Sequence, residues 1–228
     1  MAEFAGVRKG DLVLDVWCGP GALTAELASR LGPAAVTAVD PSEPFVSAAR
    51  ERNPEVNVLQ ASAEALPFAD AMFDASLAQL VVHFMADPVA GLAEMARVTR
   101  ADGLVVASVW DFGGGQSPLD AFWRAARDFD PDINDESERA GAREGQLVAL
   151  FEAAGLRQIE ITALSVNLAH PTFEAWWEPF TGGVGPAGAL VASLDADGQM
   201  DLRERCRAGL PRAPFTITAR AWAARGLV

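Results

Sequence analysis

The sequence predicts an α/β protein built on a doubly wound, mostly parallel sheet of seven strands with a small helical cap. Three observations predict this class. Short apolar runs alternate with helix-periodic segments through residues 12–110, as parallel strands alternate with crossover helices. A glycine turn directly follows the first run. Two further strand patterns, at 157–164 and 215–222, are separated by a long helical insertion.

Size and composition favour one folded domain that binds a small molecule. The 228 residues are 50% hydrophobic, enough for one substantial core. The formal net charge of −13 and the scattered basic residues disfavour a nucleic-acid surface. No apolar run approaches the roughly 18 residues of a membrane span, and the first residues lack a secretion-signal pattern. Cys18 and Cys206 form neither a disulfide framework nor a metal site, so we expect a cytoplasmic protein.

The first strand, turn and helix predict a polar ligand site. Apolar residues 12–16 predict a buried parallel strand, Gly19-Pro20-Gly21 a tight turn, and residues 22–31 a helix that stops at Gly32. Glycine permits backbone conformations and a close ligand approach that a Cβ blocks. The start of the helix presents unpaired N–H groups and the positive end of its dipole, which favour an anionic or polar ligand.

The second strand, 36–39, ends in an acid that is a candidate ligand-binding residue. Asp40 follows the strand, Ser42 is a candidate N-cap, and residues 43–52 predict a helix. An acid at this position of an α/β sheet accepts hydrogen bonds from ribose hydroxyls. The alternative is a loop acid that merely precedes the helix cap. Its spacing behind the glycine turn favours ligand binding.

Three more strands complete the regular part of the sheet. Residues 56–59, 73–79 and 104–110 predict strands, and residues from 88 to about 100 predict a helix between the last two. Gln79 lies at the carboxyl end of its strand, the edge of an α/β sheet where ligands bind.

After residue 111 the pattern changes. Gly113-Gly114-Gly115 predicts either a hinge or a solvent loop. Helices are predicted at 119–128, 143–154, 172–180, 188–194 and 199–208, with strands at 157–164 and 215–222. The insertion between these strands is too long for a hairpin, so we expect it to fold back as a cap over the site.

The glycine turn is compatible with two cofactor classes. A dinucleotide site requires GxGxxG, but Thr24 occupies the third glycine position. The segment VLDVWCGPG instead resembles the first motif of class I S-adenosylmethionine (SAM)-dependent methyltransferases, Asp/Glu-x-Gly-x-Gly-x-Gly. Asp15, Gly19 and Gly21 match that motif, and Trp17 stands at its first glycine.

Later segments extend the resemblance over nearly the whole chain. ASAEALPF at 61–68 is similar to the family's GDAExLPF, with Ser62 in place of the acid that holds the adenine edge, and RVTRADG at 97–103 is similar to RVLRPGG. The resemblance implies a Rossmann-like methyltransferase fold whose SAM-binding half is 1–111, with the remaining sheet and cap in 112–228 as one domain overall. The SAM-binding residues that it implies are Asp15, Trp17, Gly19, Gly21, Asp40, Pro41, Ser42, Ser62, Ala63 and Gln79.

Methyl transfer from a sulfonium is an in-line displacement, for which a protein mainly holds donor and acceptor together. No metal is required. His83, just beyond the strand that ends at Gln79, is a candidate general base, although a packed histidine is the alternative. A small-molecule acceptor is expected to contact aromatic residues, of which some belong to the core. The candidates are Trp110, Phe112, Trp123, Trp176 and Trp177.

Two other functions remain open at this point. The first is a non-catalytic binding protein that keeps the methyltransferase fold but has a SAM site impaired by Trp17 and Ser62. The second is a nucleotide-dependent oxidoreductase, which the missing third glycine disfavours.

Overall fold

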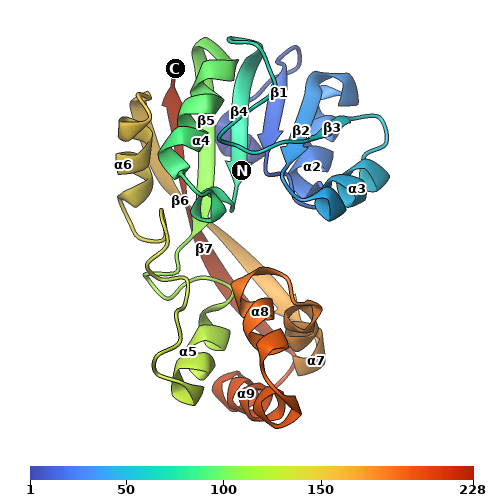
Figure 1. The fold of residues 1–228 in the computed structure, drawn as a ribbon, viewed down its shortest axis with the longest axis vertical. Coiled ribbons are helices and arrows are strands. Elements are labelled where there is room, and N and C mark those ends of the chain that lie inside the picture. The colour runs from blue at the N-terminus through green and yellow to red at the C-terminus, as the bar shows by residue number, and fades with distance from the viewer. The chain divides into compact units, whose positions relative to one another are not determined.

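A computed structural model describes residues 1–228 and confirms the α/β fold. Its seven strands form one sheet in the order β3-β2-β1-β4-β5-β7-β6 (Figure 1). The strands are β1 Val13–Val16, β2 Val36–Asp40, β3 Asn57–Gln60, β4 Phe73–Gln79, β5 Thr99–Trp110, β6 Arg157–His170 and β7 Phe215–Leu227.

The first five strands are parallel. β1 pairs with β2 and β4, β2 pairs with β3, and β4 pairs with β5, all in parallel register. Every residue of β1 is buried, as its continuous apolar run predicts for a central parallel strand. The carboxyl ends of these strands therefore meet along one edge of the sheet, where the glycine turn follows β1, Asp40 ends β2 and Gln79 ends β4.

β7 runs antiparallel to its neighbours. The Asp102 N–H donates to the Val228 carbonyl (3.3 Å) and the Asp111 N–H to the Arg220 carbonyl (2.9 Å). Later residues of β5 therefore pair with earlier residues of β7, as in an antiparallel pair. Figure 1 draws β7 with its arrowhead opposite to that of β6. The last strand of the chain is therefore antiparallel to β5.

β6 and β7 are longer than the sequence predicts. In β6 the apolar positions shift from odd to even numbers between Ala163 and Leu164, so the simple alternation ends there although the strand continues to His170. In β7 residues 221–224 are all buried, because an inner strand is covered on both faces. Alternation finds strands with one buried face and misses such extensions.

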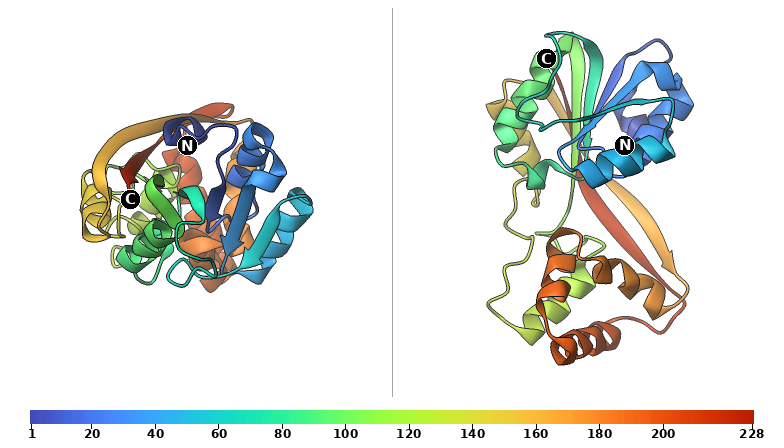
Figure 2. Two further views of the ribbon diagram at one scale, coloured as in Figure 1. Left: turned by 90° about the horizontal axis from the view of Figure 1, so that it is seen from above. Right: turned by 45° about the vertical axis from the view of Figure 1, so that its right-hand side comes forward.

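Nine α-helices accompany the sheet: α1 Ala2–Ala5, α2 Ala22–Leu31, α3 Glu43–Arg52, α4 Pro88–Val98, α5 Asp120–Phe129, α6 Gln146–Ala153, α7 Phe173–Trp177, α8 Gly185–Ser193 and α9 Ala196–Gly209. Short 3₁₀ helices lie at Pro33–Ala35, Val82–Phe84 and Glu178–Gly182. Figure 2 shows α2 and α3 on one face of the sheet and α4 and α6 on the other, the doubly wound arrangement.

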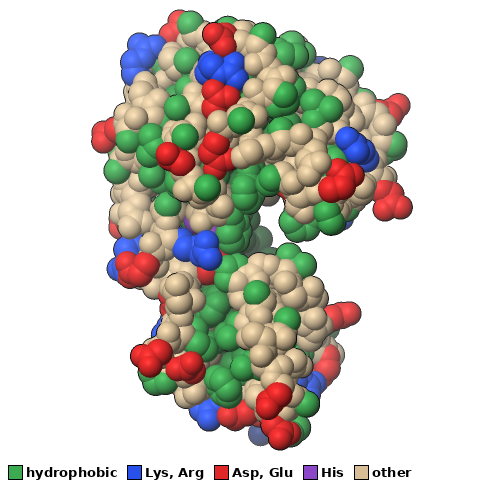
Figure 3. Space-filling model, in the orientation of Figure 1, with side chains coloured by type: hydrophobic (Ala, Val, Ile, Leu, Met, Phe, Trp, Pro, Cys, Tyr) green, Lys and Arg blue, Asp and Glu red, His purple; other side chains and the backbone are tan.

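The chain divides into two compact units, with β6 and β7 running through both. Unit 1 comprises Met1–Val109, Glu144–Leu164 and Trp222–Val228. One of its cores joins α1, α2 and α3 to β1, β2 and β4 through buried aliphatic side chains such as Val13, Leu27 and Val46. On the visible face of each unit, acidic side chains are scattered between isolated Lys and Arg residues (Figure 3).

Unit 2, Trp110–Arg143 and Ser165–Ala221, is mainly helical. Its core is aromatic, with the rings of Phe122 and Phe180 stacked at 4.6 Å between centroids. These helices are the elements that the sequence predicts for a cap, and their position over the site stays a prediction.

The glycine-rich loop of unit 2 is held in place by an ion pair between the buried Asp111 and the partly exposed Arg220. Asp111 is 1% exposed, and its carboxylate accepts hydrogen bonds from the Gly114 N–H (2.9 Å) and from Nε (2.8 Å) and Nη2 of Arg220. A Cβ on Gly114 would lie 2.4 Å from the Asp111 carboxylate. The glycine at 114 therefore allows the loop to close on this carboxylate, a local role that the hinge prediction did not include.

Candidate active site

The candidate site lies in unit 1, along the carboxyl edge of β1, β2, β3 and β4 (Figure 1). The turn after β1 is tied to the end of β2, since the Cys18 N–H donates to the Val39 carbonyl at 3.0 Å. Within the turn the Gly21 N–H donates to the Cys18 carbonyl at 3.0 Å, and α2 begins directly afterwards. The strand, glycine turn and helix are thus arranged as predicted.

Trp17 adopts the backbone conformation of the glycine that it replaces. Its φ is +58°, in the left-handed region, as are Gly19 at +54° and Gly21 at +78°. A non-glycine residue pays roughly 1–2 kcal/mol for that conformation. The turn therefore keeps the path of a glycine loop despite the indole.

Asp40 fastens the turn. Its Oδ2 accepts from the Gly19 N–H and its Oδ1 from the Ser42 N–H, both at 2.9 Å. The side chain is almost fully buried, and burial raises its pKa, although the two N–H donors oppose this shift. The acid predicted to bind ribose thus also determines the shape of the turn.

Asp15 lies inside the protein beneath the turn. It is 1% exposed, and the Thr24 hydroxyl donates to its Oδ2 at 2.6 Å. Burial raises its pKa to about 7, with a smaller contribution from Asp40, while the Thr24 hydrogen bond opposes the shift. Asp15 therefore supports the turn from within and is part-protonated near neutral pH.

Asn53, which no sequence motif singles out, supports the turn. Its Nδ2 donates to the carbonyls of Gly21 and Ala49, each at 3.1 Å, and the side chain is buried. A Cβ at Gly21 would lie 2.4 Å from this nitrogen. The only sequence signal is an asparagine directly after the helix that ends at Arg52, which by itself predicts a helix cap.

Ser62 and Ala63 follow β3 at the same edge. Asp40 registers with Gln60, and the Ala61 N–H donates to the Asp40 carbonyl at 3.1 Å. The structure thus brings Ser62 near the end of β2, as the prediction requires. The Ser62 hydroxyl donates to Glu64 Oε2, a contact that sequence analysis did not anticipate.

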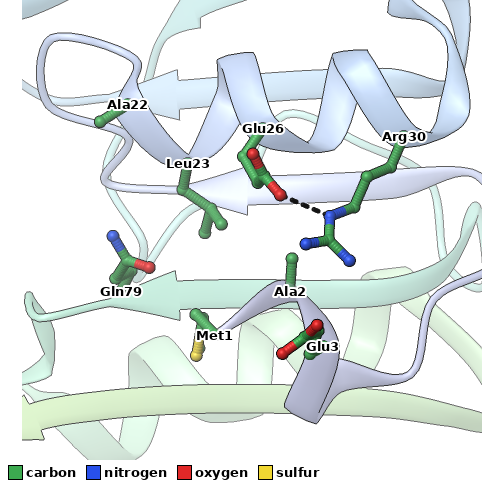
Figure 4. A pocket seen from close by; sticks show the side chains of 8 residues that line it. All are labelled: Met1, Ala2, Glu3, Ala22, Leu23, Glu26, Arg30 and Gln79. Carbon is green, nitrogen blue, oxygen red and sulfur yellow. Dashed lines mark hydrogen bonds and ion pairs between the residues drawn. The ribbon is translucent and has the colours of Figure 1, made fainter. Parts of the chain in front are cut away.

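Gln79 ends β4 and borders a pocket of about 310 Å³. The other walls of the pocket are α1 and one side of α2, from Ala22 in its first turn to Arg30 in its last, where Arg30 pairs with Glu26 (Figure 4). Figure 4 shows Gln79 on the opposite side of this pocket from Arg30, near the end of α2 that carries Ala22. The pocket extends from the glycine turn toward α1.

His83 lies in the 3₁₀ helix after β4 and is buried. Its ring is 3.9 Å from that of Phe84, between centroids, and only 6% of the residue is exposed. The packed histidine that sequence analysis offers as an alternative matches this placement.

The structure does not bring the predicted acceptor-contacting aromatics into one pocket of either unit. Trp123, Trp176 and Trp177 are buried in the core of unit 2, and the Trp123 indole N–H donates to Glu136 at 3.0 Å. Phe112 is buried and Trp110 is half-buried at the end of β5. Large aromatic side chains stabilise a small helical unit, and this packing accounts for the three tryptophans.

The turn fits an adenosyl cofactor on two observations. Nothing lies within 4 Å of a Cβ built on Gly19, so the space above the turn is open. The buried Trp17 Nε1 has no hydrogen-bond partner in the protein, and a buried unpaired donor is costly unless a ligand accepts from it. With Asp40, Ser62 and Gln79 along the same edge, the site offers both donors and acceptors to a polar ligand.

The chain is similar to known methyltransferases over part of its length. Residues 14–107 match a methyltransferase domain model. The chain is 36% identical over 123 residues to the ubiquinone/menaquinone biosynthesis C-methyltransferase UbiE of Bdellovibrio bacteriovorus, covering 52% of each chain. It is 43% identical over 101 residues to a demethylmenaquinone methyltransferase of Mycobacterium sp. strain KMS, covering 44% of this chain and 42% of the relative.

The fold has solved relatives. A SAM-dependent methyltransferase of Thermotoga maritima matches with a TM-score of 0.58 at 17% identity, covering 98% of this chain and 85% of that one. The sequence relatives are matched over only about half of their length. No helix is long and apolar enough to cross a bilayer. The matched segment contains the glycine turn, Asp40, Ser62 and Gln79, so the similarity to methyltransferases extends over the residues of the candidate site.

Proposed function

We propose that this protein transfers a methyl group from SAM to a small-molecule acceptor. The observation that carries the proposal is the grouping of the glycine turn, Asp40, Ser62 and Gln79 along one sheet edge, inside the segment that matches the methyltransferase model. The bound cofactor supplies an activated methyl group on a sulfonium. The protein's contribution is mainly to position the two reactants.

Each residue of the edge has a proposed role. Asp40 accepts from the ribose hydroxyls with the lone pairs that its backbone partners leave, while Gly19 and Gly21 allow close approach to the turn. Pro41 and Ser42 shape the chain beside Asp40, and Ser62 and Ala63 face the adenine edge. Gln79 and the Trp17 indole N–H bind polar groups of the methionine part.

The acceptor is proposed as a small organic molecule. The names of the sequence relatives point to ubiquinone and menaquinone precursors, so demethylated quinones are the first compounds to test. The methyltransferase model ends at residue 107, before unit 2 begins at Trp110. Unit 2 is therefore the part in which acceptor selectivity can differ from that of the relatives.

His83 is proposed as the general base if the molecule that receives the methyl group carries a hydroxyl, an amine or an acidic C–H. Imidazole is the side chain whose unperturbed pKa lies nearest neutrality. His83 lies in the 3₁₀ helix just after β4, the strand that ends at Gln79. A catalytic role predicts that His83→Gln lowers the methylation rate and flattens its pH profile without weakening cofactor binding. If His83→Gln instead lowers both the cofactor affinity and the thermal stability, His83 has a packing role.

Calorimetric titration of SAM and of its demethylated product, S-adenosylhomocysteine, tests the cofactor site. We expect micromolar binding by the unaltered protein and at least a tenfold loss in Asp40→Asn, because the amide cannot accept from both ribose hydroxyls and both backbone N–H groups. Asp102→Asn is the matched control, since that side chain is 82% exposed at the opposite edge of the sheet.

Trp17→Gly separates the enzyme from a non-catalytic relative. Binding by the unaltered protein shows that the indole is accommodated. Binding only after Trp17→Gly means that the indole closes the site, which supports a protein that keeps the fold without the activity. Absence of binding in both proteins contradicts the proposed function.

A further inference from the structure

In the loop after β3, hydrogen bonds connect Ser62, the predicted adenine contact, through Glu64 to the segment that follows β4. Ser62 donates its hydroxyl proton to Glu64 Oε2, and Glu64 Oε1 accepts from the N–H groups of Ala86 (2.9 Å) and Asp87 (3.4 Å). Both oxygens of Glu64 are therefore held, one by the segment after β4 and one by Ser62. The carboxylate is fixed at both ends.

This arrangement determines which way the Ser62 hydroxyl points. A hydroxyl has one proton and two acceptor lone pairs, and an ionised carboxylate only accepts. Burial acts to raise the pKa of Glu64, but the hydrogen bonds from Ser62 and from the backbone outweigh it and leave the pKa below its usual value. Glu64 is thus ionised at neutral pH, and the only proton of Ser62 is committed to it.

We infer that Glu64 is a positioning residue that makes Ser62 an obligate hydrogen-bond acceptor for the 6-amino group of the cofactor's adenine. The inference rests on the proposed function, which places adenine at this edge. A free serine hydroxyl donates or accepts according to its partner, so it discriminates little. A serine whose proton is held by a carboxylate accepts only, and the negative charge behind it strengthens that bond.

The pair therefore replaces, over two residues, the single acid that the family motif carries at position 62. The register places this acceptor beside Asp40, because Gln60 pairs with Asp40 and the Ala61 N–H donates to the Asp40 carbonyl. Selectivity for a ring that bears an amino group follows directly, since only a donor satisfies this hydroxyl.

The test compares the binding of two ligands by calorimetry. One is S-adenosylhomocysteine, and the other is its analogue with hydrogen in place of the 6-amino group. The two ligands differ only in the donor that Ser62 is inferred to accept from. We expect the unaltered protein to prefer the amino ligand about tenfold, the ratio for one hydrogen bond that the carboxylate behind Ser62 strengthens.

Variants locate the origin of that ratio. Ser62→Ala is expected to reduce the preference to about onefold. Glu64→Gln keeps an oxygen for the Ala86 and Asp87 N–H groups but places an amide donor against Ser62, so the preference should fall to about threefold or less. Ser62→Asp alone should keep a preference of about tenfold or more, and it should restore that preference when it is added to Glu64→Gln.

Glu94→Gln is the matched control. Glu94 accepts from the Leu66 N–H at 3.0 Å in the same loop but does not contact Ser62, so its variant should keep the full ratio. If Glu64 only supports the loop, Glu64→Gln weakens both ligands equally and the ratio stays unchanged, which overturns the inference. Equal binding of both ligands by the unaltered protein also overturns it and leaves the proposed function standing. Failure of both ligands to bind overturns the two together.

Discussion

Gly21→Ala should destabilise the protein strongly, for reasons that can be added up. Gly21 has a φ of +78°, so alanine there costs roughly 1–2 kcal/mol of backbone strain. The new Cβ would lie 2.4 Å from Nδ2 of Asn53 and 3.2 Å from Ala49, so the asparagine must move. Asn53 then loses two buried hydrogen bonds, each worth about 1 kcal/mol. The sum is about 3–4 kcal/mol.

Gly19→Ala separates the two causes. Its φ of +54° imposes a similar strain, but its Cβ meets nothing within 4 Å, so we expect a loss of only about 1–2 kcal/mol. Urea unfolding of the ligand-free proteins, followed by circular dichroism, measures both losses without reference to activity. Equal stability of the two variants would show that the Asn53 contact adds nothing to the cost of Gly21→Ala. The same conclusion follows if Asn53→Ala, which clears the space, does not reduce the cost of Gly21→Ala.

Three further predictions concern buried charges. The pKa of Asp15 is raised to about 7, so between pH 8 and pH 5 the native protein takes up a proton that the unfolded chain does not. The free energy of unfolding should therefore rise by about 2–3 kcal/mol over this range, and Asp15→Asn should remove that rise in urea titrations at each pH. Arg220→Met leaves the buried Asp111 carboxylate without its cation and should cost about 3 kcal/mol, part of which Asp111→Asn restores in a double-mutant cycle. Trp123→Phe removes the donor to Glu136 and should lower the free energy of unfolding by about 1–3 kcal/mol, with no change in which methyl acceptor the enzyme prefers. A changed preference in a competition assay between acceptors would show that Trp123 contacts the acceptor.

The regular elements were predictable because the sequence marks their ends. Gly21 and Gly32 enclose α2, Asp40 ends β2 and Ser42 precedes α3, and the bounds of α2, α3 and β4 agree with the prediction. Glycine, proline and cap residues act within a few residues of chain, so one sequence is sufficient to locate them.

The contacts that shape the site were not predictable, because they join residues far apart in the chain. The hydrogen bond from Gly19 to Asp40 spans 21 residues and that from Asn53 to Gly21 spans 32. Motif spacing indicated that Asp40 is close to the turn, but it did not indicate that the Asp40 carboxylate accepts a hydrogen bond from the turn. The tryptophans of unit 2 illustrate the same limit, because composition alone does not distinguish an aromatic core from an aromatic pocket.

The strand order has a consequence for how the chain folds as it is made. β6 lies at the edge of the sheet, and its neighbour there is β7, which follows it by more than forty residues. Until β7 is synthesised, β5 and β6 both expose unpaired edges, which are prone to pair with other chains. The closing step therefore depends on residues 215–227, and their loss should leave β6 without a partner and the sheet open at β5.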